Sequence, residues 1–186
     1  MSFVEFYVSL SKFLIAMRKI IALLFLAVTL NSCDDGDITL ESFNFEEQNI
    51  VKCSNNNLLF KIKNDELLLV SLSDNDFAIA FEEASTPEGQ PRVFNVNTNN
   101  KIIYRKYSDN LTNNSICTLI PPATPVVTKE WNASGGTIEV IATELFDETD
   151  GTSLGFTYNL VFQNVNFSST EDSFSFTTYI FGDYQP

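Results

Sequence analysis

From residue 38 onward, hydrophobic and polar residues alternate with a period of two over much of the chain. Side chains of a strand point alternately to its two faces, so this pattern predicts β-strands. The stretches with this pattern are residues 77–81, 92–97, 137–143, 155–162 and 173–181. Shorter apolar runs that also fit strands are residues 58–63, 66–72 and 101–107.

Turn-forming residues separate these stretches. Asn, Asp, Ser and Gly gather at residues 54–57, 63–65, 73–76, 98–100, 134–136, 148–152 and 169–172. No window after residue 38 shows a helical period with capping residues. Strands separated by turns about every 8–12 residues are typical of two packed sheets. The sequence therefore predicts an all-β fold, a β-sandwich of immunoglobulin-like or related Greek key topology.

One predicted strand is expected to bend. Within residues 155–167, apolar residues occupy even positions up to Phe162 and odd positions from Val165 onward. A change of face requires a bulge or a bend, so we expect one near Gln163 and Asn164.

The segment Leu119–Pro125 is the candidate boundary within this fold. Three prolines cannot lie in a central strand, and they favour a stiff, extended chain. The piece that follows, residues 126–186, is small for an all-β domain that folds alone. We therefore expect one β-sandwich domain over residues 38–186, with a subdivision at 119–125 as the alternative.

The N-terminal residues have the order of an export signal. Arg18 and Lys19 precede an apolar run over residues 20–30, and the small Ser32 precedes Cys33. This is the order of a signal peptide, and the run is shorter than the roughly 20 apolar residues that span a bilayer. We predict a signal peptide over residues 1–32, with translation starting at Met17. An ordinary buried apolar helix that ends at a cysteine by chance is the alternative.

Leu30-Asn31-Ser32-Cys33 resembles the lipobox of bacterial lipoproteins, and Asp34–Asp37 is similar to the acidic tract of surface-directed Bacteroidetes lipoproteins. The resemblance implies cleavage before Cys33, acylation of Cys33 with palmitate or similar chains, and an acidic tether over residues 33–37. It also implies attachment to the membrane through the lipid and a place at the outer membrane, exposed at the cell surface.

Composition and charge exclude several functions. The chain has no histidine and carries 11 basic against 24 acidic residues, a net charge of -13. Without histidine, Ser-His-Asp triads, Cys-His dyads and the usual zinc sites are excluded. The acidic chain repels phosphate backbones, so nucleic acid is not an expected partner. Since no phosphate-binding glycine loop, GxSxG or CxxC motif is present, we predict no cofactor and no catalytic residue.

Cys53 and Cys117 remain once Cys33 is assigned to lipid. An even pair in an exported protein is expected to form a disulfide. On the chain-entropy model such a bridge stabilises by on the order of 4 kcal/mol. Two buried free thiols are the alternative.

Two acidic stretches are candidate calcium sites. The first contains Asp74 and Asp76, and the second contains Asp147, Glu148 and Asp150. Clustered carboxylates supply the oxygen ligands that calcium prefers. However, neither stretch fits the twelve-residue calcium loop, and such residues are common in turns. We therefore predict solvated turns and no metal site.

Six aromatic residues are candidates for a platform on which sugar rings stack. Side chains of this kind more often complete a core, and this is the interpretation that we favour. The residues are Tyr104, Tyr107, Trp131, Tyr158, Tyr179 and Tyr184.

Together these features favour a lipid-anchored module without catalytic machinery that binds a protein or polysaccharide partner at the cell envelope. One alternative is a glycan hydrolase that works with paired carboxylates. The other is a subunit of a surface fibre, for which residues 173–186 are the candidate exchanged strand.

Overall fold

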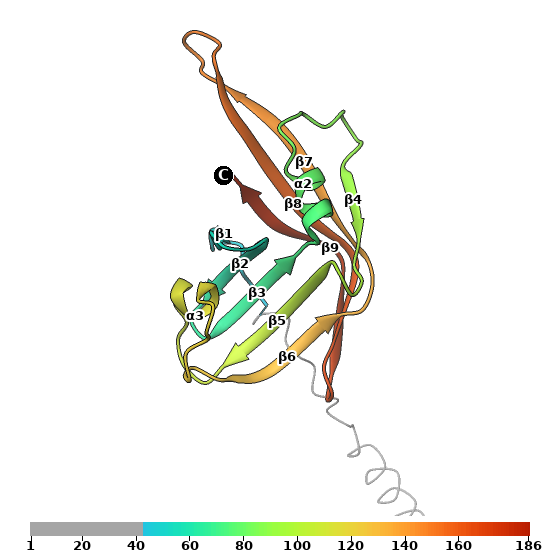
Figure 1. Cartoon of the computed structure of the whole chain (residues 1–186). Coiled ribbons are helices and arrows are strands. Elements are labelled where there is room, and N and C mark those ends of the chain that lie inside the picture. Colours follow the sequence, from blue (N-terminus) through green and yellow to red (C-terminus); the bar gives the residue numbers. More distant parts are fainter. Residues whose placement is uncertain (1–42) are drawn as a thin grey trace, which may run out of the picture. The chain divides into compact units, whose positions relative to one another are not determined.

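The computed structural model describes residues 43–186, which form an antiparallel β-structure with two short helices (Figure 1). The elements in chain order are β1 (Val51–Lys52), β2 (Leu58–Lys63), β3 (Glu66–Ser71), α2 (Asp74–Ala80), β4 (Arg92–Asn95), β5 (Lys101–Tyr107), α3 (Asn113–Cys117), β6 (Val127–Ala133), β7 (Thr137–Phe146), β8 (Ser153–Ser168) and β9 (Ser173–Tyr184). The predicted all-β, sandwich-like fold is confirmed.

The strands form a continuous hydrogen-bonded sheet in the order β1-β2-β3-β5-β6-β8-β7-β4, and β9 pairs with β8. Strand β8 is central. One edge of β8 pairs with β7 as far as Gln163 and then with β6 at Phe167 and Ser168, while its other edge pairs with β9. Because β6 and β7 follow one another along a single edge, the sheet turns there. Its two parts, β1-β2-β3-β5-β6 and β4-β7-β8-β9, enclose the main core (Figure 1).

The bend predicted in β8 is confirmed at this turn. Inward-facing side chains change from Phe162 to Val165, and Asn164 has a left-handed backbone with φ 52°. Gly136, in the turn between β6 and β7, packs against this point with φ 88°. A Cβ atom at residue 136 would lie 2.4 Å from the carbonyl oxygen of Gln163, so the close approach of the two backbones requires glycine.

Strands β2 and β3 are buried on both faces. Leu68 and Val70 face the main core, whereas Leu67 and Leu69 face a second, smaller apolar cluster on the outer side of the sheet. This arrangement explains why the sequences of these strands are continuous apolar runs rather than alternating ones.

One predicted strand is wrong, because residues 77–81 form most of helix α2 and its C-cap. Ser73 is the N-cap, and its Oγ accepts a hydrogen bond from the backbone N–H of Asp76 at 3.2 Å. Phe77 and Phe81 lie one helical turn apart, with ring centroids 4.6 Å from each other. A spacing of four residues fits one face of a helix as well as one face of a strand. The N-cap at Ser73 favours the helix. The predicted turn at 73–76 is therefore the start of this helix.

Strands β5 and β6 pair across the candidate boundary at residues 119–125. Their register places Tyr104 opposite Trp131, and these two rings stack with centroids 4.8 Å apart. The strands before and after the proline-rich segment thus belong to the same sheet. Strand β6, strand β1 and helix α3 were not among the predicted elements.

The residues before β1 contribute to the main core. Phe43 and Phe45 are buried, and the ring of Phe43 contacts Tyr104 and Tyr179 at centroid distances of 5.0 and 5.1 Å. The buried Lys61 donates a hydrogen bond from Nζ to the backbone oxygen of Phe45 at 3.0 Å. Burial lowers the pKa of Lys61, partly offset by nearby carboxylates. The chain that leads to the predicted lipid site is therefore packed into the domain at its first described residues.

Candidate functional site

Cys33, the predicted lipid-bearing residue, and the rest of the lipobox lie outside the described residues, as do the signal peptide and the acidic tether. Within residues 43–186, neither helix has the length and apolar character needed to cross a bilayer. The lipid anchor therefore stays a prediction from the sequence.

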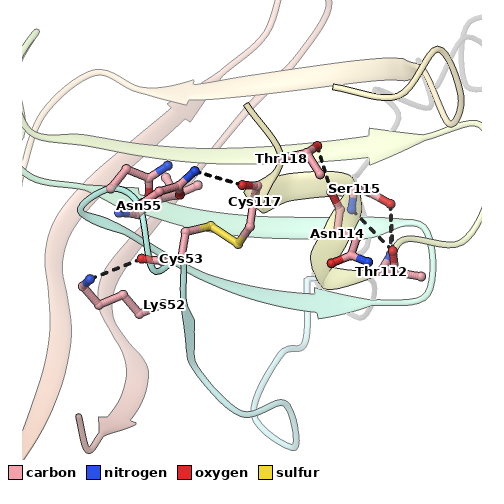
Figure 2. The surroundings of a disulfide bond; sticks show 10 residues. Lys52, Cys53, Asn55, Thr112, Asn114, Ser115, Cys117 and Thr118 are labelled. Atoms are coloured by element: carbon pink, nitrogen blue, oxygen red, sulfur yellow. Dashed lines mark hydrogen bonds between the residues drawn. A yellow bond between two sulfur atoms is a disulfide. The ribbon is translucent and has the colours of Figure 1, made fainter. Parts of the chain in front are cut away.

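Cys53 and Cys117 form a disulfide, as the sequence predicted, with their Cα atoms 5.3 Å apart. Figure 2 shows the bridge between the chain after β1 and the C-terminal end of α3. Asn55 adds a second link, because its Nδ2 donates a hydrogen bond to the backbone oxygen of Cys117 at 3.3 Å. The disulfide thus attaches the end of α3, where the next loop begins, to the chain between β1 and β2.

Local contacts explain why so short a helix forms next to the bridge. Thr112 is its N-cap, and Thr112 and Ser115 bond reciprocally, each side-chain oxygen accepting from the backbone N–H of the other residue (Figure 2). This capping box gives the backbone N–H groups of Thr112 and Ser115 a side-chain acceptor each at the start of the helix. Helix α3 in turn places Ile116 against the second apolar cluster, which includes Phe60, Leu67 and Leu69.

Residues 118–126, which we name the proline-rich loop, connect α3 to β6 and carry the most exposed large apolar side chains in the described part of the chain. Leu119 is 89% and Ile120 is 85% exposed. The loop is fixed at one end by the disulfide of Cys117. At the other end, Val126 accepts a hydrogen bond from the backbone N–H of Ser108 at 2.9 Å.

An apolar groove of about 400 Å³ lies between this loop and the outer face of the sheet. Its polar lining comes from Arg105, Tyr107 and Ser115. Arg105 Nε also pairs with Glu130 Oε2 at 2.6 Å. The other lining residues are apolar: Leu58, Leu67, Leu69, Ile116, Pro121, Pro122, Pro125, Val126 and Val127. We refer to this space as the apolar groove.

A second, polar groove of about 410 Å³ lies where β6 meets the turn between β8 and β9. Lys129 borders it, and Lys129 Nζ pairs with Asp172 at 2.6 Å and with Glu171 at 3.0 Å. Asp172 also accepts hydrogen bonds from Trp131 Nε1 and from Ser169 Oγ. Its remaining lining is polar as well: Thr128, Glu130, Asn132, Ser168, Ser169 and Thr170.

The network around Asp172 changes the protonation of its members. Burial raises the pKa of Asp172, but the hydrogen bonds from Lys129, Ser169 and Trp131 outweigh that effect, and the pKa is lowered. The hydrogen bonds that Lys129 donates to Asp172 and Glu171 raise the pKa of Lys129. Both groups are therefore charged at neutral pH, and they fasten β6 to the β8–β9 turn.

The two acidic stretches have local roles. Asp76 accepts a hydrogen bond from Asn100 Nδ2 at 2.8 Å, which lowers the pKa of Asp76. Asp147 and Asp150 accept backbone N–H groups from Thr149 and Thr152 in the turn between β7 and β8, and their pKa values are lowered as well. No group of three or more Cys, Asp or Glu side chains is arranged to hold a metal ion within the described residues.

The aromatic residues are divided between the core and its margin, as the sequence analysis favoured. Tyr104, Trp131, Tyr158 and Tyr179 are buried, while Tyr107 and Tyr184 are half-buried. Burial raises the pKa of Tyr179 to about 12. Since four of the six rings are covered by protein, they do not form an exposed platform for sugars.

The hydrolase alternative requires a carboxylic acid with a raised pKa opposite a carboxylate. Glu130 borders the polar groove, and its pKa is lowered, because hydrogen bonds from Asn132 and Arg105 outweigh the opposing effect of burial. The pKa of Asp172 is also lowered, because the hydrogen bonds that it accepts outweigh the effect of burial. These two carboxylates are therefore poor candidates for the general acid of such an enzyme.

The alternative of a surface-fibre subunit requires a terminal strand that is unpaired within its own domain. Residues 173–184 form β9, which pairs with β8 from Ser168↔Ser173 to Tyr158↔Tyr184 and buries Tyr179 and Phe181. The C-terminal segment thus completes its own domain in this structure.

Sequence reasoning missed both grooves. The apolar groove combines side chains from β2, β3, β5 and the proline-rich loop, which are far apart in the chain. One sequence signal was available, since no charged residue occurs between Asp109 and Lys129 in an otherwise acidic chain.

The fold and the disulfide define this part of the chain as an all-β, sandwich-like, disulfide-bonded domain. Comparison of the chain with protein-family models, with curated proteins and with solved structures finds no match to any of them.

Proposed function

We propose that this protein is a bacterial lipoprotein, anchored through acyl chains on Cys33, whose β-domain binds a protein or polysaccharide partner at the cell envelope. The order Arg18-Lys19, apolar run, Leu30-Asn31-Ser32-Cys33 carries the proposal. Two or more acyl chains attach a protein stably to a bilayer without any spanning helix.

The disulfide supports export. Cys53 and Cys117 are bonded, and disulfides persist in oxidising compartments such as the periplasm and the cell surface, while they are rare in the cytosol. The disulfide therefore supports the proposed export with an observation that does not depend on the signal segment.

The grooves support binding rather than catalysis. The polar groove offers hydroxyl, amide, ammonium and carboxylate groups, which suit the hydroxyl groups of a polysaccharide. Glu130, which lines the groove, and the neighbouring Asp172, which pairs with Lys129, have lowered pKa values, which suits hydrogen-bond acceptors and not proton donors. We place the partner at this groove.

The anchor is tested by feeding cells a labelled fatty acid and purifying the protein. We expect label in the wild-type protein and its loss in Cys33→Ala, which then leaves the membrane fraction. The Cys53→Ser/Cys117→Ser double variant removes two cysteines without touching the lipid site, so it is the matched control and should keep the label. An unlabelled wild-type protein would refute the proposal.

The partner is tested by protease treatment of intact cells followed by cross-linking. Exposure at the surface predicts that external protease removes the protein. Thr128→Arg and Thr170→Arg, which place bulk in the polar groove, should reduce cross-linking to the partner, and Thr143→Arg on exposed β7 should not. Equal cross-linking by all variants would exclude this groove.

A further inference from the structure

The proline-rich loop poses a physical problem. Leu119 and Ile120 remain 89% and 85% exposed although the apolar groove lies beside them. Exposed apolar side chains normally gather into whatever apolar space is available. The loop is prevented from doing so, because it is fixed at Cys117 and at Val126, and three prolines stiffen the chain between these points.

The loop and its neighbours along the chain also differ in charge from the rest of the chain, and Arg105, which lines the apolar groove, is paired with Glu130. No charged residue occurs between Asp109 and Lys129, whereas the whole chain has a net charge of -13. Val126 and Val127, at the loop's end, are 51% and 44% exposed and extend the apolar surface. This region forms an uncharged apolar projection on an acidic protein.

A second copy of the chain is a poor occupant for this projection. Without residues 1–32, each copy carries 8 basic and 23 acidic residues, a net charge of -15, so two copies repel one another. A standard interface also involves about 20–30 residues on each side, far more than the four exposed apolar side chains here. A bilayer surface needs no matching partner surface, and a zwitterionic one carries no net charge.

The chain between Cys33 and the described domain is short enough to keep the domain close to the bilayer that would carry the lipid. Nine residues separate Cys33 from Phe43, the first described residue. Fully extended, a chain of that length spans about 30 Å, which is comparable to the size of a small domain. A domain tethered in this way meets the membrane surface continually, so a small apolar projection suffices for contact.

We propose that the proline-rich loop inserts Leu119 and Ile120 into the interface of the lipid bilayer that carries the anchor, and so orients the domain on the membrane. This inference rests on the proposed acylation of Cys33. The loop acts as a second, shallow contact, and the disulfide keeps it projecting.

The test uses the acylated protein, purified from membranes and placed on phosphatidylcholine vesicles with acyl chains brominated near the headgroup. Interfacial side chains reach about 5–10 Å into the bilayer, so bromine at that depth quenches an inserted tryptophan. Leu119→Trp should lose about half of its emission, beyond the baseline of the buried Trp131. Leu154→Trp, on the β7–β8 hairpin and 57% exposed, is the matched control and should not be quenched.

A second set of variants removes the apolar contact. With Ile120→Trp as reporter, Leu119→Asp should abolish quenching, because a carboxylate keeps the loop in water, whereas Leu154→Asp should leave it unchanged. An unquenched Leu119→Trp on acylated protein would overturn the inference and leave the proposed function intact. A blue shift without bromine quenching would indicate a second copy and would also overturn it. An intact mass without acyl chains would refute both proposals.

Discussion

At the scale of single residues, a few side chains hold together the point where the sheet turns. Trp131 and Lys129 of β6 both bond Asp172 in the turn after β8. Gly136 lets the next turn lie against the bend of β8. These residues are close in space because β6 and β7 share one edge of β8.

Asp172→Asn should lower the free energy of unfolding by about 1–3 kcal/mol at pH 7, because it weakens bonds from Lys129 and Trp131. The pKa of Asp172 is depressed in the folded protein, so its contribution is present above the unfolded value of about 3.9 and is lost as the pH falls through the folded value. The free energies of unfolding of the wild type and of Asp172→Asn, measured by urea titration, should therefore differ less at pH 3 than at pH 7. Glu171→Gln, at a side chain 73% exposed, is the control and should change little.

Gly136→Ala should destabilise the domain by about 2–3 kcal/mol. The new Cβ would lie 2.4 Å from the carbonyl oxygen of Gln163, and the positive φ of 88° disfavours alanine in addition. Gly135→Ala is the matched control, because no atom lies within 4 Å of its Cβ position. In thermal melts, Gly136→Ala should have a lower melting temperature than Gly135→Ala. Equal melting temperatures would contradict the close approach of the backbones at Gly136 and Gln163.

At the scale of elements, the outer face of β2 and β3 depends on a cover that the sheet does not supply. Leu111, just before helix α3, and Ile116 of the helix pack into the apolar cluster that contains Leu67 and Leu69. The disulfide attaches this cover to Cys53, just after β1. A strand pair that is apolar on both faces needs such a cover to stay out of water.

Reduction of the disulfide should lower the free energy of unfolding by about 2–4 kcal/mol, since the loop that it closes spans 64 residues. The measurement is urea unfolding with and without a thiol reductant. The Cys53→Ser/Cys117→Ser variant should already show the lower stability and should not respond to the reductant. A wild-type protein that is insensitive to reduction would mean that the cover holds without the bridge.

Helix α2 depends on its N-cap. Ser73→Ala removes the acceptor for the backbone N–H of Asp76 and should cost about 1 kcal/mol, measured by urea unfolding. Ser175→Ala, at an exposed residue of β9, is the control and should stay within about 0.5 kcal/mol of wild type. A neutral Ser73→Ala would show that packing of Phe77 and Phe81 alone forms the helix.

At the scale of the whole domain, the two sides of the proline-rich loop are joined by strand pairing. β5 pairs with β6, β6 pairs with β8, and the main core takes side chains from both parts of the sheet. A structure with a shared core and a shared sheet is expected to unfold as one unit.

Urea unfolding should therefore be a single transition that is identical for Trp131 fluorescence and for far-ultraviolet circular dichroism. Trp131 lies in the residues after the loop, while circular dichroism reports all the strands. Two separated midpoints would support the subdivision at 119–125 instead.

How far the sequence predicts this protein depends on the range of the interactions concerned. Strands β2 and β5 match their predicted residues, and the bend at Asn164 follows from the change of apolar parity, because side-chain alternation is a property of the strand itself. The alternation of residues 77–81 does not predict helix α2, because Phe77 and Phe81 fit both periods. Only the hydrogen bond that Ser73 Oγ accepts from the backbone N–H of Asp76 distinguishes helix from strand.

The sequence by itself determined the β-class of the domain, most of its turns and the pairing of Cys53 with Cys117. These depend on local periodicity, on residue type or on counting. The export signal before Cys33 stays a prediction from the sequence. Only the tertiary structure decided that β8 joins both parts of the sheet, that the tyrosines are mostly core, and where the two grooves lie. The reason is physical: a groove and a shared edge are made by side chains and backbones far apart in the chain, and their meeting depends on how the strands pack.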